Sequence, residues 1–311
     1  MDKYVRGVKL ADGDLRINSK VYAARNKQTN QKVVLKIMLD KECARKEAAI
    51  QQRLMRDGGD HWIAEIIESF QLNENFVIVM RQYEINLHDV HNAHSIPSKD
   101  IQTYMKQLLQ GLNFMHHRGI IHRDIKSHNL LIDDRNVLKI GDLGSSRLDD
   151  VGDKTPSITT LWYRPIEVLL GNRDYTNTVD IWSAGCVMAE LYRRSPLFQF
   201  RDEIPMIRMI CEVCGTPGAP LWQDQFPGLE WLTLVENNEP QLRRAIPFAN
   251  NRALNLIRRM FQFNYIDRVS ANDALDDPYF HQEDDSPIND NQQEPDYPPP
   301  QPRDDRYMYV L

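Results

Sequence analysis

A short stretch of the chain places several chemically active side chains between two apolar runs. Within Ile121–Ile132, the carboxylate of Asp124, the ammonium group of Lys126 and the amide of Asn129 follow closely on one another. The apolar residues at both ends indicate that the stretch is held in a hydrophobic core while its polar part forms a loop. We therefore predict a catalytic loop at the mouth of a core. The alternative is a polar turn between two strands.

The spacing H-R-D-x-K-x-x-N over His122–Asn129 resembles the catalytic loop of the eukaryotic protein kinases. In that family the Asp accepts the proton of the substrate hydroxyl, and the Asn holds a magnesium ion. The resemblance implies that Asp124 is the base, that Lys126 stabilises the transferring phosphate and that Asn129 is a metal ligand. It extends over roughly residues 4–281, with the family's motifs in the expected order.

Three further side chains complete the phosphate-handling set that the resemblance implies. Lys36, at the end of V-V-L-K, matches the strand lysine that contacts the α- and β-phosphates of ATP. Glu47, on a predicted helix, is expected to form an ion pair with Lys36, and Glu42 is its competitor. Asp142, in D-L-G where the family has D-F-G, is expected to bind magnesium together with Asn129, because carboxylate and amide oxygens suit this cation. The implied cofactors are ATP and Mg²⁺.

The adenine site is expected at the junction of two lobes. Met80 resembles the gatekeeper residue, and Arg81, Gln82 and Tyr83 resemble the hinge whose backbone bonds adenine. Met80 fits an ordinary core position equally well.

The loop that covers the phosphates departs from the family. Aligned backwards from Val21, the pattern G-x-G-x-x-G-x-V falls on Asp14, Arg16 and Ser19 where glycines are expected. Glycines there allow backbone amides to approach the phosphates. The departure favours an alternative function, a pseudokinase that acts as a binding scaffold. The retained base, metal ligands and lysine–glutamate pair favour an active enzyme.

Several blocks resemble the cyclin-dependent kinases in particular. They are Ala24–Lys27, Thr160–Arg164, Glu167–Gly171 and Cys214–Gly218. The resemblance implies phosphorylation of Ser or Thr before proline in protein substrates, with Arg164 shaping the proline pocket, and it implies a cyclin-like activator. Because Cys43–Ile50 departs from the family's activator-binding helix, another activator, or none, is the alternative.

Regulation is expected at Thr155, where the family carries an activating phosphothreonine. A phosphate there needs cations. The candidates are Arg123, Arg147 and Lys46. Two hydroxyls of the same segment are rival sites, Ser157 and Thr159.

Two acidic residues are expected to support the site without touching ATP. Glu167 should form a buried ion pair with Arg268, and Asp180 should brace the backbone of the catalytic loop.

The elements that must position these residues suggest an α+β fold, the bilobal protein kinase fold. A small, β-rich N-lobe with five strands and one helix precedes a larger, mainly helical C-lobe. The expected bounds are 1–80 for the N-lobe, 81–83 for the hinge, 84–281 for the C-lobe and 282–311 for a disordered, acidic, Pro-rich tail. Among the predicted elements are strands at Lys20–Arg25, Lys32–Met38, Ile63–Phe70 and Asn75–Met80, and helices at Glu42–Met55, Ile101–His117, Asp180–Tyr192, Pro205–Cys214 and Arg252–Phe261.

Composition narrows the class of protein. The chain has 311 residues, of which 41% are hydrophobic and 26% charged, with a net charge of −6 that gives no case for nucleic-acid binding. No apolar run approaches the ~20 residues of a membrane span. Four cysteines are too few for a disulfide framework, and Cys211-x-x-Cys214 lacks the further ligands of a zinc site. We therefore expect an intracellular protein, cytoplasmic or nuclear, with no membrane partner.

Overall fold

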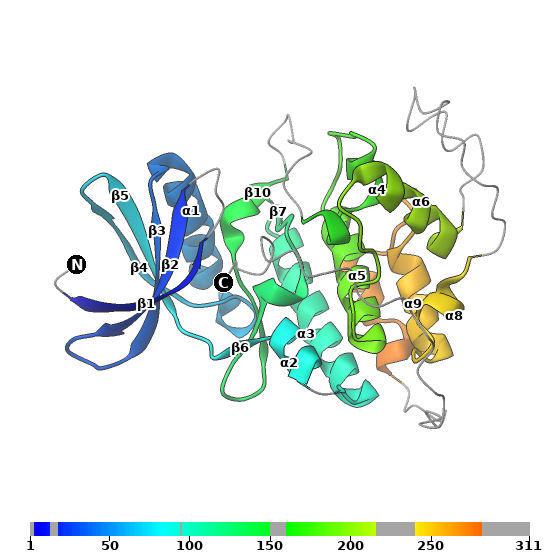
Figure 1. Ribbon diagram of the computed structural model, residues 1–311, viewed down its shortest axis with the longest axis horizontal. Coiled ribbons are helices and arrows are strands. Elements are labelled where there is room, and N and C mark those ends of the chain that lie inside the picture. The colour runs from blue at the N-terminus through cyan, green and yellow to red at the C-terminus, as the bar shows by residue number, and fades with distance from the viewer. Residues whose placement is uncertain (1–2, 13–17, 94, 150–159, 216–239, 282–311) are drawn as a thin grey trace.

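The computed structural model describes residues 3–12, 18–93, 95–149, 160–215 and 240–281. A sheet and one long helix lie at one end of the molecule, and a bundle of helices forms the other end (Figure 1). This is the bilobal α+β architecture expected from the sequence. The proposed tail at 282–311 lies outside the described residues.

The N-lobe is built on an antiparallel sheet, which has five strands among the described residues, in the order β1-β2-β3-β5-β4. The strands are β1 Tyr4–Asp12, β2 Ser19–Asn26, β3 Lys32–Met38, β4 Ile66–Leu72 and β5 Asn75–Arg81. Lys36 of β3 stands opposite Val21 of β2 and Ile78 of β5. Directly opposed residues share a face of a sheet, so Lys36 projects from the same face as these two side chains.

Helix α1, Lys41–Arg56, packs on that face. Asp40 caps its first turn by accepting hydrogen bonds from the backbone N–H groups of Glu42 and Cys43. Its Ala44 and Ala48 pack with Ile78 in one hydrophobic cluster. The helix is thereby pressed against the face that carries Lys36.

The C-lobe surrounds α5, Thr178–Arg193, in which every residue from Val179 to Tyr192 is buried. A helix that is apolar on most sides is stable only inside a core. The other helices are α2 Leu87–Ala93, α3 Ser98–His116, α4 Ile166–Leu169, α6 Glu203–Cys214, α8 Leu242–Ala245, α9 Asn251–Met260 and α10 Ala271–Leu275. One large hydrophobic cluster joins α3, α5, α6 and α9. This core is the rigid base on which the loops of the site are mounted.

The remaining elements are short strands and single turns of 3-10 helix. The strands are β6 Ile85–Asn86, β7 Ile120–Ile121, β8 Leu130–Ile132, β9 Leu138–Ile140 and β10 Arg147–Leu148. The 3-10 turns are η2 Gly59–His61, η3 Ser127–Asn129, η4 Leu143–Ser145, η5 Leu161–Tyr163 and η6 Pro278–Phe280. Strand β8 pairs with both β6 and β9, and β10 pairs with β7. The loops that carry Asp124 and Asp142 therefore begin and end on paired strands.

Local sequence signals and the structure differ at two places. Ser98, a residue type that often caps helices, does not cap α3, because it is itself helical and Pro97 occupies the N-cap without a side-chain hydrogen bond. Strand β4 begins at Ile66, three residues later than expected, because Ile63 forms a separate bridge to Ile140.

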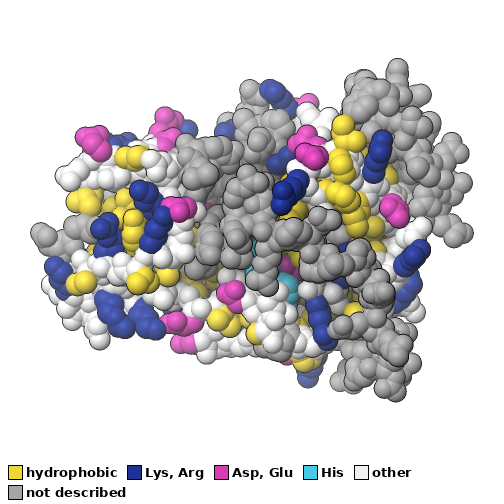
Figure 2. Space-filling model, in the orientation of Figure 1, with side chains coloured by type: hydrophobic (Ala, Val, Ile, Leu, Met, Phe, Trp, Pro, Cys, Tyr) yellow, Lys and Arg dark blue, Asp and Glu magenta, His cyan; other side chains and the backbone are white. Residues whose placement is uncertain are grey.

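Two features of the described residues bear on possible partners. No helix among them is long and apolar enough to cross a membrane. On the face seen in Figure 2, Lys and Arg side chains are interspersed with Asp and Glu over both lobes.

Candidate functional site

Three charged side chains from three elements meet between the lobes. The ammonium group of Lys36 lies 2.8 Å from Glu47 Oε1 and 2.8 Å from Asp142 Oδ1. The side chains of these residues are only 6%, 1% and 14% exposed. The sequence therefore identified the correct partner on α1, since Glu42 instead pairs with Lys46 on the exposed side of the helix.

Burial and neighbouring charges shift the pKa values of Lys36 and Asp142 in opposite directions. Burial by itself lowers the pKa of Lys36, but the carboxylates of Asp142 and Glu47 outweigh it and hold that pKa above its ordinary value. Burial likewise tends to raise the pKa of Asp142, and Lys36 brings it down to about 2. Lys36 is therefore cationic and Asp142 anionic at neutral pH, as phosphate and metal binding require.

Asp142 reaches this position through an unusual backbone conformation. Its φ of +51° lies in the left-handed region, directly after β9, and its side chain accepts a hydrogen bond from the N–H of Gly144. A Cβ atom on Gly144 would lie 3.2 Å from Glu47 Oε2 and 3.3 Å from Lys36 Nζ. The glycine thus leaves the space in which the three charges meet.

The start of the catalytic loop is held by Asp180 of α5. Its carboxylate accepts the backbone N–H groups of His122 at 2.9 Å and Arg123 at 2.7 Å, and His116 Nε2 lies 2.9 Å away. Arg123 has a φ of +67°, which is costly for a residue with a side chain. The two hydrogen bonds to a buried carboxylate stabilise that turn. The brace expected from the sequence is present.

The proposed base and its neighbours form a compact polar group. Asp124 Oδ1 accepts hydrogen bonds from both the backbone N–H and the hydroxyl of Thr160, each at 3.1 Å. Lys126 Nζ lies 3.0 Å from Asp124 Oδ2 and donates to the Thr160 hydroxyl at 3.1 Å. The catalytic loop and the segment that carries Thr160 are thus joined at the carboxylate.

Asn129 is oriented by the same carboxylate. Its amide nitrogen donates to the Asp124 carbonyl at 2.8 Å and to Asp124 Oδ2 at 3.0 Å. Its Oδ1 atom is buried and has no hydrogen-bond partner among the described residues. Buried polar atoms are nearly always paired, so an unpaired amide oxygen on a side chain that contacts the Asp124 carboxylate suits a hard cation such as Mg²⁺.

The residues expected at the adenine site lie among apolar side chains. Val21 is fully buried and clusters with Ala11 and Val34, and Met80 packs against this cluster. Met80 also packs against the cluster beneath α1, so the core interpretation holds as well. Gln82 and Tyr83 follow β5 and are partly buried. Of the phosphate-covering loop, Asp14 and Arg16 lie outside the described residues.

The proposed regulatory cations lie near one another around β10. Arg147 is on this strand, and its charge opposes protonation of both Arg123 and Lys46. Burial is the main cause that lowers the pKa of Arg123, whose guanidinium donates to the Ser145 carbonyl and the Tyr175 hydroxyl. Thr155, with its rivals Ser157 and Thr159, lies outside the described residues.

Two further arginines that the sequence singled out form ion pairs that differ in burial. Arg268 and Glu167 form a two-pronged ion pair at 2.7 and 2.8 Å, and neither side chain is exposed. This is the structural pair expected from the sequence. Arg164 is paired at 2.8 Å with Glu203, which is largely exposed.

The close cysteine pair is not arranged as a reactive site. Cys211 and Cys214 are free thiols on α6. Burial raises the pKa of Cys211 to about 12 and raises that of Cys214 as well. Thiols of such high pKa remain protonated and unreactive.

Sequence reasoning assigned no role to Thr160 or to Glu190, although both hold the catalytic loop. Glu190 of α5 accepts hydrogen bonds from Ser127 at 2.9 Å and from Tyr163 at 2.8 Å. The signal in the sequence is slight: Glu190 is an acidic residue in the otherwise apolar run 184–192. A buried carboxylate at such a position needs partners, but their identity depends on the fold.

Comparison with known proteins gives a consistent result. The family model for the protein kinase domain matches residues 5–280. Cyclin-dependent kinase B2-1 of Oryza sativa subsp. japonica is 34% identical over 90% of this chain and 90% of its own length. Cyclin-dependent kinase 7 of Dictyostelium discoideum is 32% identical over 90% of this chain and 80% of its own. Cyclin-dependent kinase D-1 of Arabidopsis thaliana is 31% identical over 90% of this chain and 71% of its own.

These matches favour the enzyme over the scaffold, since nothing in them supports the pseudokinase alternative. Members of the family use ATP, and typically Mg²⁺, to phosphorylate proteins. The chain belongs to the protein kinase family and is a serine/threonine kinase of the cyclin-dependent-kinase-like group.

Proposed function

We propose that Asp124 is the catalytic base of this kinase and that Lys36, Asn129 and Asp142 hold the phosphates and the metal. The observation that carries the proposal is the unpaired, buried Oδ1 of Asn129, and the ion pair of Lys36 with Asp142 supports it. A metal bound by Asn129 and Asp142 would neutralise charge on the phosphates.

The chain's own residues then divide the work. Lys36 neutralises phosphate charge, and Glu47 fixes its position through the buried ion pair. Asp124 receives the proton of the substrate hydroxyl, while Lys126 places a positive charge next to the transferring phosphoryl group. Thr160 orients Asp124 through two hydrogen bonds. Val21, Met80 and the hinge residues Gln82 and Tyr83 are proposed to enclose adenine.

Transfer of radiolabel from ATP to a peptide that contains Ser-Pro tests the roles of these residues. Because a positioned base contributes about 10²- to 10⁴-fold, Asp124→Asn should lower the rate by that factor while the protein stays folded. Thr160→Ala should lower it less, because the carboxylate remains. A full rate in Asp124→Asn would overturn the assignment of the base.

We also propose that the substrate site prefers proline after the phosphorylated residue and that Arg164 shapes the pocket. The support is its position directly after η5, where Glu203 holds its guanidinium. Peptides that differ only in Pro or Ala after the serine provide the matched comparison. Equal rates for the two peptides would exclude the preference.

Control of activity is proposed to depend on Thr155 and on a cyclin-like activator. The support is that Arg147 interacts electrostatically with both Lys46 and the buried Arg123, together with the similarity to cyclin-dependent kinases. Thr155→Ala should lower activity toward protein substrates, and Ser157→Ala is its control. Capture of a cyclin-fold protein by the purified kinase would support the activator. A cytoplasmic or nuclear location fits these partners and the four free thiols.

A further inference from the structure

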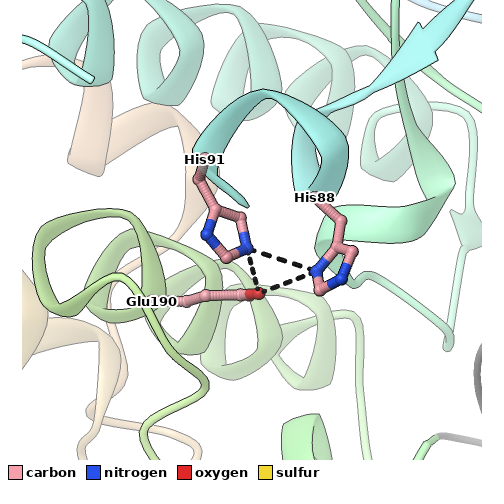
Figure 3. A group of neighbouring side chains, drawn as sticks. All are labelled: His88, His91 and Glu190. Atoms are coloured by element: carbon pink, nitrogen blue, oxygen red, sulfur yellow. Dashed lines mark hydrogen bonds and ion pairs between the residues drawn. The ribbon is translucent and has the colours of Figure 1, made fainter. Parts of the chain in front are cut away.

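Two histidines and a glutamate converge behind the catalytic loop. His88 and His91 lie on α2 and Glu190 on α5, and Figure 3 shows both imidazole rings and the carboxylate pointing toward one another. Among the described residues, this is the one group of three His, Cys, Asp or Glu side chains whose possible ligand atoms gather closely enough to hold a metal ion. No step of phosphoryl transfer uses it.

The distances suit a small divalent cation. His91 Nε2 lies 3.0 Å from Glu190 Oε1, His88 Nδ1 lies 3.6 Å from the same oxygen, and the two nitrogens are 3.2 Å apart. Ligands at ~2.0–2.1 Å from a tetrahedral Zn²⁺ are separated by about 3.3 Å. The three separations lie on either side of this value, so the ion would fit with little movement.

The group is also poorly satisfied by hydrogen bonds alone. If both nitrogens carry hydrogen, two N–H dipoles are brought together at one oxygen. If either lacks hydrogen, its lone pair faces a carboxylate. A cation at the centre removes both conflicts, because nitrogen and oxygen lone pairs all point toward it.

Surrounding side chains orient the proposed ligands. The amide nitrogen of Asn92 lies 2.8 Å from Nε2 of His88. Because Nδ1 can bind a metal only when Nε2 carries the proton, the metal-bound ring requires the Asn92 amide to turn and present its oxygen as the acceptor. Tyr163 donates to Oε2 of Glu190 and Ser127 donates to Oε1, so the carboxylate is held at both oxygens and the second lone pair of Oε1 faces the metal position. Such outer contacts are typical of metal-binding imidazoles and carboxylates. The His88 side chain is 23% exposed, which provides an entry path, whereas those of His91 and Glu190 are 2% and 0% exposed.

The lack of one hydrogen bond limits the affinity of this group for a metal ion. Nδ1 of His91 is buried and has no hydrogen-bond partner among the described residues. The ring is therefore free to place its proton there and present a lone pair at Nε2, but without the outer contact that usually strengthens a ligand. We expect an affinity about 10- to 100-fold weaker than that of a site in which this nitrogen is bonded.

We infer that His88, His91 and Glu190 form a Zn²⁺ site, with a water molecule as the fourth ligand, that ties α2 to α5 behind the catalytic loop. Glu190 also accepts a hydrogen bond from Ser127, and the ring of His88 stacks on that of His128 at 3.8 Å. The ion would thus stiffen η3, the turn that ends in Asn129. This inference stands independently of the proposed catalytic roles.

Cobalt titration of the untagged, full-length protein tests the site directly. Co²⁺ held by two imidazoles and a carboxylate in a tetrahedron absorbs visible light strongly, whereas Co²⁺ in an octahedral oxygen site absorbs weakly. Excess Mg²⁺ keeps the site at Asp142 and Asn129 occupied. We expect one equivalent of the tetrahedral spectrum, bleached by one equivalent of Zn²⁺, and a Zn²⁺-dependent rise in melting temperature.

Variants assign the signal to the three ligands. His88→Ala should abolish the spectrum and the rise in melting temperature, and Asn92→Ala should weaken binding by about 10- to 100-fold. His117→Ala, which removes an exposed histidine from the end of α3, is the matched control and should bind as the unchanged protein does. If His91→Ala fails to fold, the partly exposed His88 still decides. The inference is overturned if no tetrahedral spectrum appears at one equivalent, or if His88→Ala retains it.

Discussion

Two buried ion pairs among the described residues, Arg268–Glu167 and Lys36–Glu47, differ in how fully their atoms are bonded. Arg268 and Glu167 share two hydrogen bonds, and Arg268 also donates to the carbonyls of Gln262 and Thr178. Lys36 contacts one oxygen of Glu47 and one of Asp142, while Glu47 Oε2 is buried without a partner among the described residues.

The difference separates a structural pair from a functional one. A saturated pair has no capacity left for a ligand, so its contribution lies in fixing the position of α4 against the loop that carries Arg268. The unsaturated pair keeps bonding capacity at a cost in stability, since a buried atom without a partner is unfavourable. Substitutions at the first pair should therefore change stability, and those at the second should change activity.

The largest effect is expected at the functional pair. Lys36→Met should lower the rate of phosphoryl transfer by about 10²- to 10³-fold, because one preorganised charge is lost from the phosphate site. Glu47 can take up a proton once its partner is gone, so the protein should remain folded. Initial rates and melting curves measure the two effects. Lys32→Met, at the exposed start of the same strand, is the control and should be active. A Lys36→Met protein with an unchanged rate would contradict the comparison.

At the structural pair, Arg268→Met should lower the free energy of unfolding by about 3–5 kcal/mol, because Glu167 is left charged and buried. Urea unfolding measures the loss, and Arg258→Met on the exposed side of α9 should cost far less. The double variant Arg268→Met/Glu167→Leu should recover much of the stability. If the double variant is no more stable than the single one, the cost does not come from an unpaired charge.

A smaller effect is expected at Asp180, which contributes to the stability of the fold and also positions the catalytic loop. Burial tends to raise its pKa, but hydrogen bonds from His116 and from backbone N–H groups hold the pKa below its ordinary value. Between the folded and unfolded pKa values the unfolded chain binds more protons, so this carboxylate stabilises the fold above about pH 4 and loses its effect as the pH falls through the folded value.

Asp180→Asn should therefore cost about 1–3 kcal/mol at neutral pH, and the difference from the unchanged protein should shrink below about pH 4. Urea unfolding at several pH values measures it, with the exposed Asp174→Asn as control. A difference that is independent of pH would show that the charge of Asp180 is not what stabilises the loop.

The smallest effect is expected from a single added methyl group. In Gly144→Ala the new Cβ would lie 3.2–3.3 Å from Glu47 Oε2, Asp142 Oδ1 and Lys36 Nζ, so the charged group must shift by a few tenths of an ångström. We expect a rise of about 2- to 10-fold in the KM for ATP, with little change in stability. Ser145→Ala in the same turn should behave as the unchanged protein. If Gly144→Ala and Ser145→Ala have equal KM values for ATP, the charged side chains around Gly144 tolerate the added methyl group.

The sequence predicted those elements whose signal is local. Strand β3 was expected at Lys32–Met38 and has these bounds, because a β-branched run is flanked by polar turns. The apolar run of α5 and the sequence separation of 11 residues between Lys36 and Glu47 were equally clear. Family resemblance supplied the rest of the site.

What could not be predicted depends on contacts between distant segments. Thr160 bonds Asp124 from 36 residues away, and His91 meets Glu190 from 99 residues away. The start of β4 depends on the bridge from Ile63 to Ile140, which no local pattern reveals. Propensities describe short windows, whereas these positions are set by packing of the whole chain.

Helix α5 fixes the dimensions of the catalytic loop. Asp180 holds one end of that loop and Glu190 the other, and the ten residue steps from one to the other span about 15 Å of rigid helix. A single inserted residue within this span would lengthen it by ~1.5 Å and turn Glu190 by about 100° away from Ser127. The length of α5 thus sets the distance between the two ends of the catalytic loop. An insertion or deletion within this helix can therefore disable the enzyme even when every catalytic side chain is preserved.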